Sequence, residues 1–317
     1  MLARAALLTA ALLGSTAGLK GLRSEAPVRR GEGNETLSLT DVAIGIISAR
    51  HMYMRGIHRA VLQHAPRGVI LQAPGDGQCL CSIRSGFAAL RKAYPRAKWY
   101  LVGNEDSFIH LERLREFLSQ YNPDQPTVIA KDVALPEHPY SINYKCEMPS
   151  PWENTNMIWW GGSSHIISNR LANMLNYDSQ CEVQGHVQKP DSDHTCFIAR
   201  SAKAPRVKFA PLGHVTGTQT DPAAIGFGSV QKSDAEEIRS SKSILIASHL
   251  TPYELESLED VNKNGVPHAM RMLPLAKNHG CNGRETDPGC NEMCRLRAVA
   301  PEPMPESHYV EPHFPNH

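Results

Sequence analysis

The sequence predicts an α/β fold in which helices flank a largely parallel sheet. Three short apolar runs, at 41–48, 69–72 and 99–102, have the composition of buried strands. Segments with helical spacing of apolar residues, at 51–64 and 83–90, separate these runs. Because strands and helices alternate along the chain, we expect a parallel sheet that binds ligands at the carboxyl ends of its strands.

The first two predicted strands end in polar residues. The run at 41–48 is apolar almost throughout, as expected of a central strand covered on both faces, and it ends at Ser48. The second strand, 69–72, runs into a Pro-Gly-Asp-Gly turn that contains Asp76. Parallel strands end at one edge of a sheet, so we expect Ser48 and Asp76 at that edge. A simpler interpretation of Asp76 is a turn-forming residue.

The third predicted strand, 99–102, runs almost directly into Asn104, Glu105 and Asp106, and a leucine-rich helix follows at 111–118. A strand, an acidic turn and a helix in this order can hold a divalent cation at the edge of the sheet. Mg²⁺ and Mn²⁺ prefer oxygen ligands and often share them with a diphosphate. The alternative interpretation is an acidic loop that caps the helix.

Two later segments have the composition of further parts of the site. The glycine pair Gly161-Gly162 follows an aromatic run and permits close backbone approach, and a helix with Ile167 on its core face is predicted after it. A late apolar strand at 243–247 leads into Ser248-His249. A single histidine at a strand end is more often structural than functional.

The N-terminus has the pattern of a secretory signal. One positive charge precedes an apolar stretch at 5–13, and small residues follow at 14–18. A short signal-anchor is the alternative, although the apolar stretch is shorter than the ~20 residues of a spanning helix. An Asn-Glu-Thr acceptor sequon at 34–36 agrees with a lumenal or extracellular chain. The expected organisation is therefore a signal peptide or anchor at 1–19, a stem at 20–40, a folded domain at 41–260 and a Cys- and Pro-rich extension at 261–317.

Composition narrows the class of protein. The net charge is +1 over 317 residues, so nothing indicates a nucleic-acid partner. The even number of cysteines, eight, predicts a disulfide-containing fold, with pairings that the sequence leaves open. Three of them, with His279, form the alternative of a zinc cluster, but their spacing matches no common zinc pattern. The cysteines are Cys79, Cys81, Cys146, Cys181, Cys196, Cys281, Cys290 and Cys294.

The third strand also carries a resemblance to a known family. The pattern Trp-Tyr-x5-Asp-Ser-Phe-Ile at 99–109, with Tyr-Asn-Pro-Asp-Gln-Pro at 121–126, resembles the metal-binding segment of Fringe-like glycosyltransferases. These are inverting β-1,3-glycosyltransferases, grouped with the core-1 galactosyltransferases. Their Asp-x-Asp-type triplet lines up with Asn104, Glu105 and Asp106, and Asn104 departs from the commonest pattern. The resemblance spans roughly 41–260 and implies a GT-A-like, Rossmann-like mixed sheet.

The resemblance implies roles for individual residues. Asp106 and His249 match the metal ligands, and Asp193 matches the general base, with Asp191 as the second choice of register. The residues that match the donor-binding positions are Ser48, Arg55, Asp76, Asn104, Glu105, Gly161 and Gly162. From the residues alone, Arg55 also has the character of a solvated helix charge, and Asp191 and Asp193 that of a helix cap.

The implied activity is the transfer of a hexose or N-acetylhexosamine from a UDP-sugar to a hydroxyl of a glycan or glycoprotein, with inversion and Mn²⁺ or Mg²⁺ as cofactor. A chain of this kind would work in the Golgi or ER lumen, anchored as a type II protein or secreted. Two alternatives remain. One is a catalytically silent glycan-binding protein on the same scaffold, which the amide of Asn104 favours. The other is a disulfide-stabilised secreted domain without a site.

Overall fold

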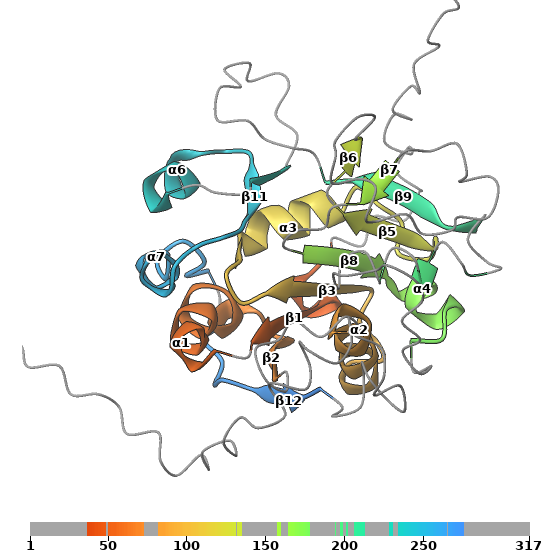
Figure 1. Cartoon of the computed structure of the whole chain (residues 1–317), viewed down its shortest axis with the longest axis horizontal. Helices are drawn as coiled ribbons and strands as arrows, with labels where there is room; N and C mark the ends of the chain where they lie inside the picture. The colour runs from red at the N-terminus through yellow and green to blue at the C-terminus, as the bar shows by residue number, and fades with distance from the viewer. Residues whose placement is uncertain are drawn as a thin grey trace, which may run out of the picture.

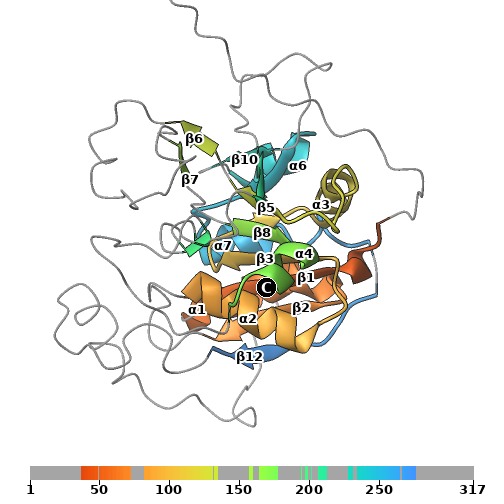
Figure 2. The same cartoon turned by 90° about the vertical axis from the view of Figure 1, so that its right-hand side faces the viewer.

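A seven-stranded sheet lies at the centre of the computed structural model of this chain (Figures 1 and 2). The residues that the structure describes are 37–48, 50–72, 82–130, 132–134, 157–159, 164–177, 194, 197–198, 201, 206–212, 228–230, 234–264 and 266–275. The strand order is β12-β2-β1-β3-β8-β5-β9. The strands are β1 (Val42–Ser48), β2 (Gly68–Gln72), β3 (Trp99–Asn104), β5 (Thr127–Ala130), β8 (Ser164–Ser168), β9 (Lys208–Pro211) and β12 (Met272–Pro274).

The sheet is mixed and largely parallel, as predicted. β1 pairs in parallel with both β2 and β3, and β12 and β9 extend the sheet in parallel at its two edges. Only β8 runs the other way, antiparallel to β3 and to β5. The three strands predicted from apolar runs are thus adjacent, and their carboxyl ends meet at one edge of the sheet.

Helices cover both faces of the sheet. In Figure 1, α1 and α7 lie on one side of β1 and β3, and α2 and α4 lie on the other. The helices are α1 (His51–Ala60), α2 (Ser82–Ala93), α3 (Leu111–Leu118), α4 (Asn169–Met174), α6 (Ala235–Ser240) and α7 (Pro252–Ser257), with short 3-10 turns at η1 (Leu39–Asp41) and η2 (Leu62–His64). This arrangement confirms the α/β class.

Two small sheets complete the described part of the chain. β4 (Phe108–Ile109), β11 (Ile244–Ala247) and β10 (Gly228–Val230) form one, and β6 (Asp132–Ala134) and β7 (Met157–Trp159) form the other. β11 is the late strand predicted before Ser248-His249. It runs antiparallel to β4, which directly follows the turn after β3.

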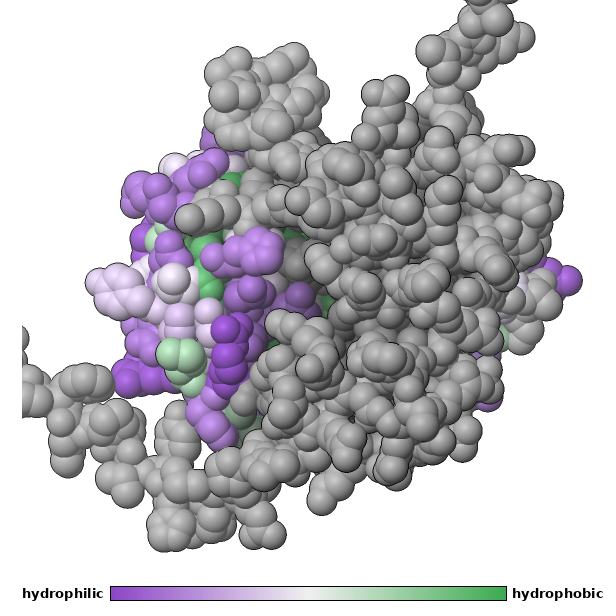
Figure 3. Space-filling model, viewed as in Figure 1, coloured by the Kyte–Doolittle hydropathy of each residue, from purple (hydrophilic) through white to green (hydrophobic). Residues whose placement is uncertain are grey.

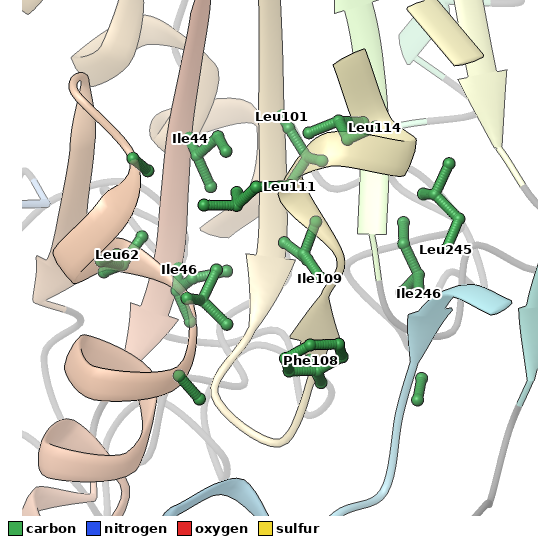
Figure 4. Packing of buried hydrophobic residues seen from close by; sticks show 14 of the residues in the cluster. Ile44, Ile46, Leu62, Leu101, Phe108, Ile109, Leu111, Leu114, Leu245 and Ile246 are labelled. Carbon is green, nitrogen blue, oxygen red and sulfur yellow. The ribbon is translucent and has the colours of Figure 1, made fainter. Parts of the chain in front are cut away.

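Alternating side chains of the strands build two apolar cores. On β1, Ile44 and Ile46 enter the core beneath α1, α3 and α7, whereas Ala43 and Ile47 enter the core beneath α2 and α4. Figure 4 shows the first core, where Phe108 and other side chains of β4 and β11 join those of β1 and β3. A strand buried on both faces explains why the run at 41–48 is apolar almost throughout.

Gly56 allows α1 and α7 to pack closely. A Cβ atom at this position would lie 3.0 Å from the Leu255 Cβ and 3.2 Å from the Pro252 carbonyl oxygen. Further along the two helices, the Arg59 guanidinium lies 3.7 Å from the Glu259 carboxylate. Contacts that advance together along both helices show that α1 and α7 run in the same direction. Both helices therefore begin at the edge where β1 and β3 end.

One predicted element differs from the structure. The segment before Asn169 was expected to open a helix with Ile167 on its core face, but Ile166 and Ile167 lie in β8, and α4 begins at Asn169. The two isoleucines are β-branched and face opposite cores, which suits a strand. The Ser168 hydroxyl then caps the helix by accepting a hydrogen bond from the Leu171 backbone N–H at 3.2 Å.

The described part of the surface seen in Figure 3 is mainly polar. On the face seen in Figure 3, the coloured residues are mostly hydrophilic, with small hydrophobic areas among them. The exposed large hydrophobic side chains of the described residues are Met52, Tyr253 and Val266. Within the described ranges, no helix combines the length and apolar character needed to cross a bilayer. The N-terminal segment and all eight cysteines lie outside the described residues.

Candidate functional site

The register of β1 and β3 brings Ser48 and Glu105 together. Ile47 lies opposite Asn104 in the parallel ladder, so the next residues of both strands are neighbours at the carboxyl edge. The Ser48 hydroxyl donates a hydrogen bond of 3.0 Å to the Glu105 carboxylate. The Arg50 backbone N–H donates another, at 3.1 Å, and the Arg50 guanidinium completes an ion pair with the same carboxylate. A cation and two donors therefore compensate the buried charge of Glu105.

Arg50 is a site residue that sequence reasoning missed. Its guanidinium also lies over the Tyr53 ring, 4.4 Å from the ring centroid. The one available signal was its position as the first basic residue after the β1 strand. The ion pair with Glu105 joins residues 55 positions apart, so no local pattern could have found it.

The pairing of β4 with β11 brings Asp106 and His249 together. Phe108 lies opposite Ala247, and an antiparallel ladder continued by two residues places Asp106 opposite His249. The Leu250 backbone N–H donates a hydrogen bond of 3.0 Å to the Asp106 carbonyl oxygen, which holds this extension. His249 Nδ1 lies 3.4 Å from the Asp106 carboxylate. The two metal ligands that the resemblance implied are thus side by side.

His249 has an unusual backbone conformation. Its φ is 62°, the one positive value at a non-glycine residue of the described chain. Such conformations are costly for residues with a side chain and concentrate at functional sites. The His249 side chain is 57% exposed, while Ser248 and Leu250 on either side are buried. The left-handed residue therefore presents an imidazole to solvent between two anchored neighbours.

The Asp106 carboxylate has an unsatisfied oxygen. Its Oδ1 atom is buried and accepts no hydrogen bond from the described residues. Burial raises the pKa of Asp106, against the opposing effects of His249 and Arg50, which lower it. An orphaned, buried carboxylate oxygen beside an imidazole is a position that a cation would satisfy.

Asp106 and His249 fit a divalent cation of the Mn²⁺ type. A carboxylate oxygen with an imidazole nitrogen is a mixed donor set that suits this ion. In the part of the chain that the structure describes, no group of three or more His, Cys, Asp and Glu side chains could hold a metal. Two protein donors alone would leave most coordination positions of such a cation to substrate phosphates and water.

The remaining predicted residues divide into two groups. Asn104 is the last residue of β3 and directly precedes Glu105 and Asp106. Arg55 lies half-buried in α1, the helix that begins at the carboxyl edge of the sheet. The others lie outside the described residues, so the structure does not place them relative to Asp106. They are Asp76, Gly161, Gly162, Asp191 and Asp193.

Of three comparisons with known proteins, one matches a protein family. The structure aligns with the crystal structure of a glycosyltransferase involved in the glycosylation of the major capsid of PBCV-1, at 12% identity and a TM-score of 0.37, over 69% of this chain and 98% of that one. A search of curated protein sequences found no match. A Fringe-like family model matches residues 76–214, which include the Asn104–Asp106 turn, the glycine pair and both aspartates near His194 but not Ser48 or His249. Over these residues, the predicted resemblance to Fringe-like proteins is confirmed.

Proposed function

We propose that this protein is a metal-dependent, inverting glycosyltransferase that transfers a hexose or N-acetylhexosamine from a UDP-sugar to a hydroxyl of a glycan or glycoprotein in β-1,3 linkage. The observation that carries the proposal is the pair Asp106 and His249, set 3.4 Å apart at the carboxyl edge of the sheet. Asp106 lies inside the Fringe-like match, and the orphaned oxygen on its carboxylate suits a cation.

The donor would bind across the ends of β1 and β3. A divalent cation, Mn²⁺ or Mg²⁺, would neutralise the charge that develops on the departing diphosphate. Asp106 and His249 would hold that cation through an oxygen and a nitrogen. The Glu105 carboxylate already binds the Ser48 hydroxyl and the Arg50 guanidinium. Its proposed role is to hold these two side chains beside the nucleotide. Arg55, Asp76, Asn104, Gly161 and Gly162 complete the proposed donor site.

The acceptor requires a base, since a sugar hydroxyl is a poor nucleophile. Asp193 would take the proton as the hydroxyl oxygen bonds to the anomeric carbon, and the bond from that carbon to the diphosphate breaks. Attack from the face opposite to UDP inverts the configuration. Asp191 is the second choice for this base.

The second candidate is a catalytically silent glycan-binding protein with the same fold. Asn104 favours it, because an amide brings no charge to a cation. For either function, we propose that the 41–260 domain acts in the lumen of the secretory pathway, reached through the signal-like segment at 1–19.

A panel of UDP-sugars with Mn²⁺ and glycan acceptors, scored by UDP release and product mass, tests the proposal. We expect turnover with one donor class and a loss of about 10²–10⁴-fold in Asp193→Asn, the usual contribution of a positioned proton acceptor. UDP affinity should be unchanged in this variant, since the base faces the acceptor. Asp191→Asn is the matched control and should be milder. Normal turnover of both variants would remove these aspartates from the mechanism.

A further inference from the structure

The Arg50 side chain is held on two sides at the carboxyl edge of the sheet. Its Nε atom forms the ion pair with the Glu105 carboxylate, and the Glu105 side chain is only 9% exposed. Its guanidinium also lies over the ring of Tyr53, which is buried. Because Glu105 in turn accepts a hydrogen bond from Ser48, both supports of the guanidinium are anchored in the fold. A side chain fixed in this way loses little entropy when it binds a ligand.

The outer part of the same guanidinium faces solvent. An arginine side chain carries five N–H donors, one on Nε and four on its two terminal amino groups. Among the described residues, the Arg50 guanidinium donates a hydrogen bond only from Nε. Its two terminal amino groups therefore have no acceptor in this part of the chain, and 49% of the side chain is exposed. A group with two adjacent oxygens could accept hydrogen bonds from both of them.

An arginine with a purely structural role is arranged differently in this protein. Arg113, in α3, donates from both of its terminal amino groups to backbone carbonyl oxygens, those of Ser241 and Ile244. These hydrogen bonds connect α3 to the start of β11. Arg50 instead uses its inner nitrogen for the fold and leaves the outer two for a ligand.

The Arg50 guanidinium lies beside the proposed metal site. Arg50 is the N-cap residue of α1, the helix that begins at the carboxyl edge. Its partner Glu105 directly precedes Asp106 in the chain. Burial raises the pKa of Asp106, and the charges of His249 and Arg50 oppose this effect. The guanidinium is thus close enough to the Asp106 carboxylate to act on its charge.

A diphosphate has the chemistry that these free donors require. Phosphate oxygens accept paired hydrogen bonds from a planar guanidinium, which an ammonium group cannot match in geometry. A cation between Asp106 and His249 would bring the diphosphate of UDP to this edge of the sheet. Since Glu105 already neutralises the charge of Arg50, the contact would depend on directed hydrogen bonds more than on net charge.

We infer that Arg50 is a specificity-determining residue whose terminal amino groups bind the diphosphate of the donor, so that the site distinguishes UDP from uridine. The inference rests on the proposed function. Negative charge increases on the diphosphate as its bond to the anomeric carbon breaks, and donors that are already in position stabilise that charge. Arg50 therefore contributes to the affinity for UDP and also to turnover.

The test compares Arg50→Gln with Arg59→Gln, because Arg59 is a second arginine of α1 that pairs with a glutamate but lies near the other end of the helix. Affinities for UDP and for uridine, both with Mn²⁺, are measured by calorimetric or NMR titration. We expect Arg50→Gln to bind UDP about 10- to 100-fold more weakly, the contribution of a hydrogen bond to a charged group. Its affinity for uridine should equal that of the wild type, and Arg59→Gln should change neither affinity.

Two further variants keep the test valid if Arg50→Gln is unstable, since that change leaves the buried Glu105 carboxylate without its cation. Arg50→Lys keeps a cation but lacks the planar pair of amino groups, and Arg50→Gln combined with Glu105→Gln removes both charges. We expect both proteins to bind UDP more weakly than the wild type, with unchanged affinity for uridine.

The two affinities together separate this inference from the proposed function. Wild-type affinity for UDP in the Arg50 variants, or an equal loss for UDP and uridine, would show that Arg50 only supports the fold around Glu105. Either result would overturn the inference and leave the glycosyltransferase in place. If the wild type itself does not bind UDP with Mn²⁺, the proposed function fails, and the inference fails with it.

Discussion

At the scale of single residues, the site depends on an unfavourable backbone angle and an unsatisfied oxygen. His249 adopts a left-handed conformation, and Asp106 keeps a buried oxygen without a hydrogen bond from the described residues. Each feature costs stability in the protein alone, and the proposed cation would satisfy the Asp106 oxygen. Local costs of this kind are expected at functional sites.

His249 allows the ligand and the backbone to be tested separately. His249→Ala and His249→Gly both remove the imidazole, but only glycine adopts a φ of 62° without strain. We expect both variants to lose affinity for UDP with Mn²⁺ to the same extent, and His249→Gly to be the more stable of the two by about 1 kcal/mol. Calorimetric titration and thermal unfolding measure these effects. Retained affinity in His249→Gly would mean that the turn matters and the imidazole does not.

At the scale of elements, one asparagine joins three of them. Asn262 is 4% exposed; its amide donates to the carbonyl oxygens of Ala60 and Ile109, both at 2.7 Å, and its oxygen accepts from the Leu111 N–H at 2.9 Å. It thus connects the end of α1, the end of β4 and the start of α3. Since β4 precedes α3 and pairs with β11, Asn262 supports the geometry that places Asp106 opposite His249.

We expect Asn262→Ala to reduce the free energy of unfolding by at least about 2 kcal/mol, because three buried backbone groups lose their partners. Asn264→Ala, an exposed asparagine two residues later, is the control and should change stability by less than about 0.5 kcal/mol. Urea denaturation of both variants gives the comparison. Equal stabilities would show that water replaces the asparagine at no cost.

His110 links helix α3 to pH. Its ring nitrogen accepts a hydrogen bond from the Arg113 N–H at the start of the helix, and burial, with the charge of Arg113, lowers its pKa to about 4. The unfolded chain therefore binds a proton before the folded one does. Stability from this group is complete above about pH 6.5 and is lost as pH falls from there toward 4.

His110→Asn is the matched variant, since asparagine also caps helices but does not titrate. We expect its free energy of unfolding to fall less steeply than that of the wild type between pH 6.5 and 4, as measured by urea denaturation at several pH values. Parallel curves for the two proteins would assign the acid sensitivity to other groups.

The sequence predicted some elements better than others, for physical reasons. Strands β1 and β3 carry long apolar runs because both of their faces are covered, so composition alone reveals them. β8 was mistaken for the start of a helix, because its isoleucines look the same in a short buried strand and in a buried helix turn. The pairing of β4 with β11 joins Ile109 to Ile246, and no local pattern encodes such a distant contact.

At the scale of the whole molecule, the predicted α/β fold is present. The parallel strands β2, β1 and β3 end at one edge of the sheet, where the sequence predicts that a ligand binds. The resemblance proposed Asp106 and His249 as partners, and the fold brings them together. Arg50 was missed, because its role depends on an ion pair across the β1–β3 edge. Asp193 and Asp191 remain predictions, since they lie outside the described residues.

We propose that Asp106 and His249 bind a divalent cation to which the diphosphate of UDP binds. The direct measurement is the melting temperature of the wild type and of Asp106→Asn, with UDP in Mn²⁺ and with UDP in EDTA. A ligand that binds only the folded state at a hundred times its Kd stabilises it by about 2.7 kcal/mol. Burial raises the pKa of Asp106, so the neutral amide should leave the protein at least as stable in EDTA.

We expect a rise in melting temperature for the wild type with UDP and Mn²⁺, no rise in EDTA, and no rise for Asp106→Asn under either condition. Asn104→Asp, which restores a charge to the turn, should keep or increase the wild-type rise. An equal rise in Asp106→Asn, or no rise in the wild type at saturating UDP and Mn²⁺, would contradict the proposed metal site.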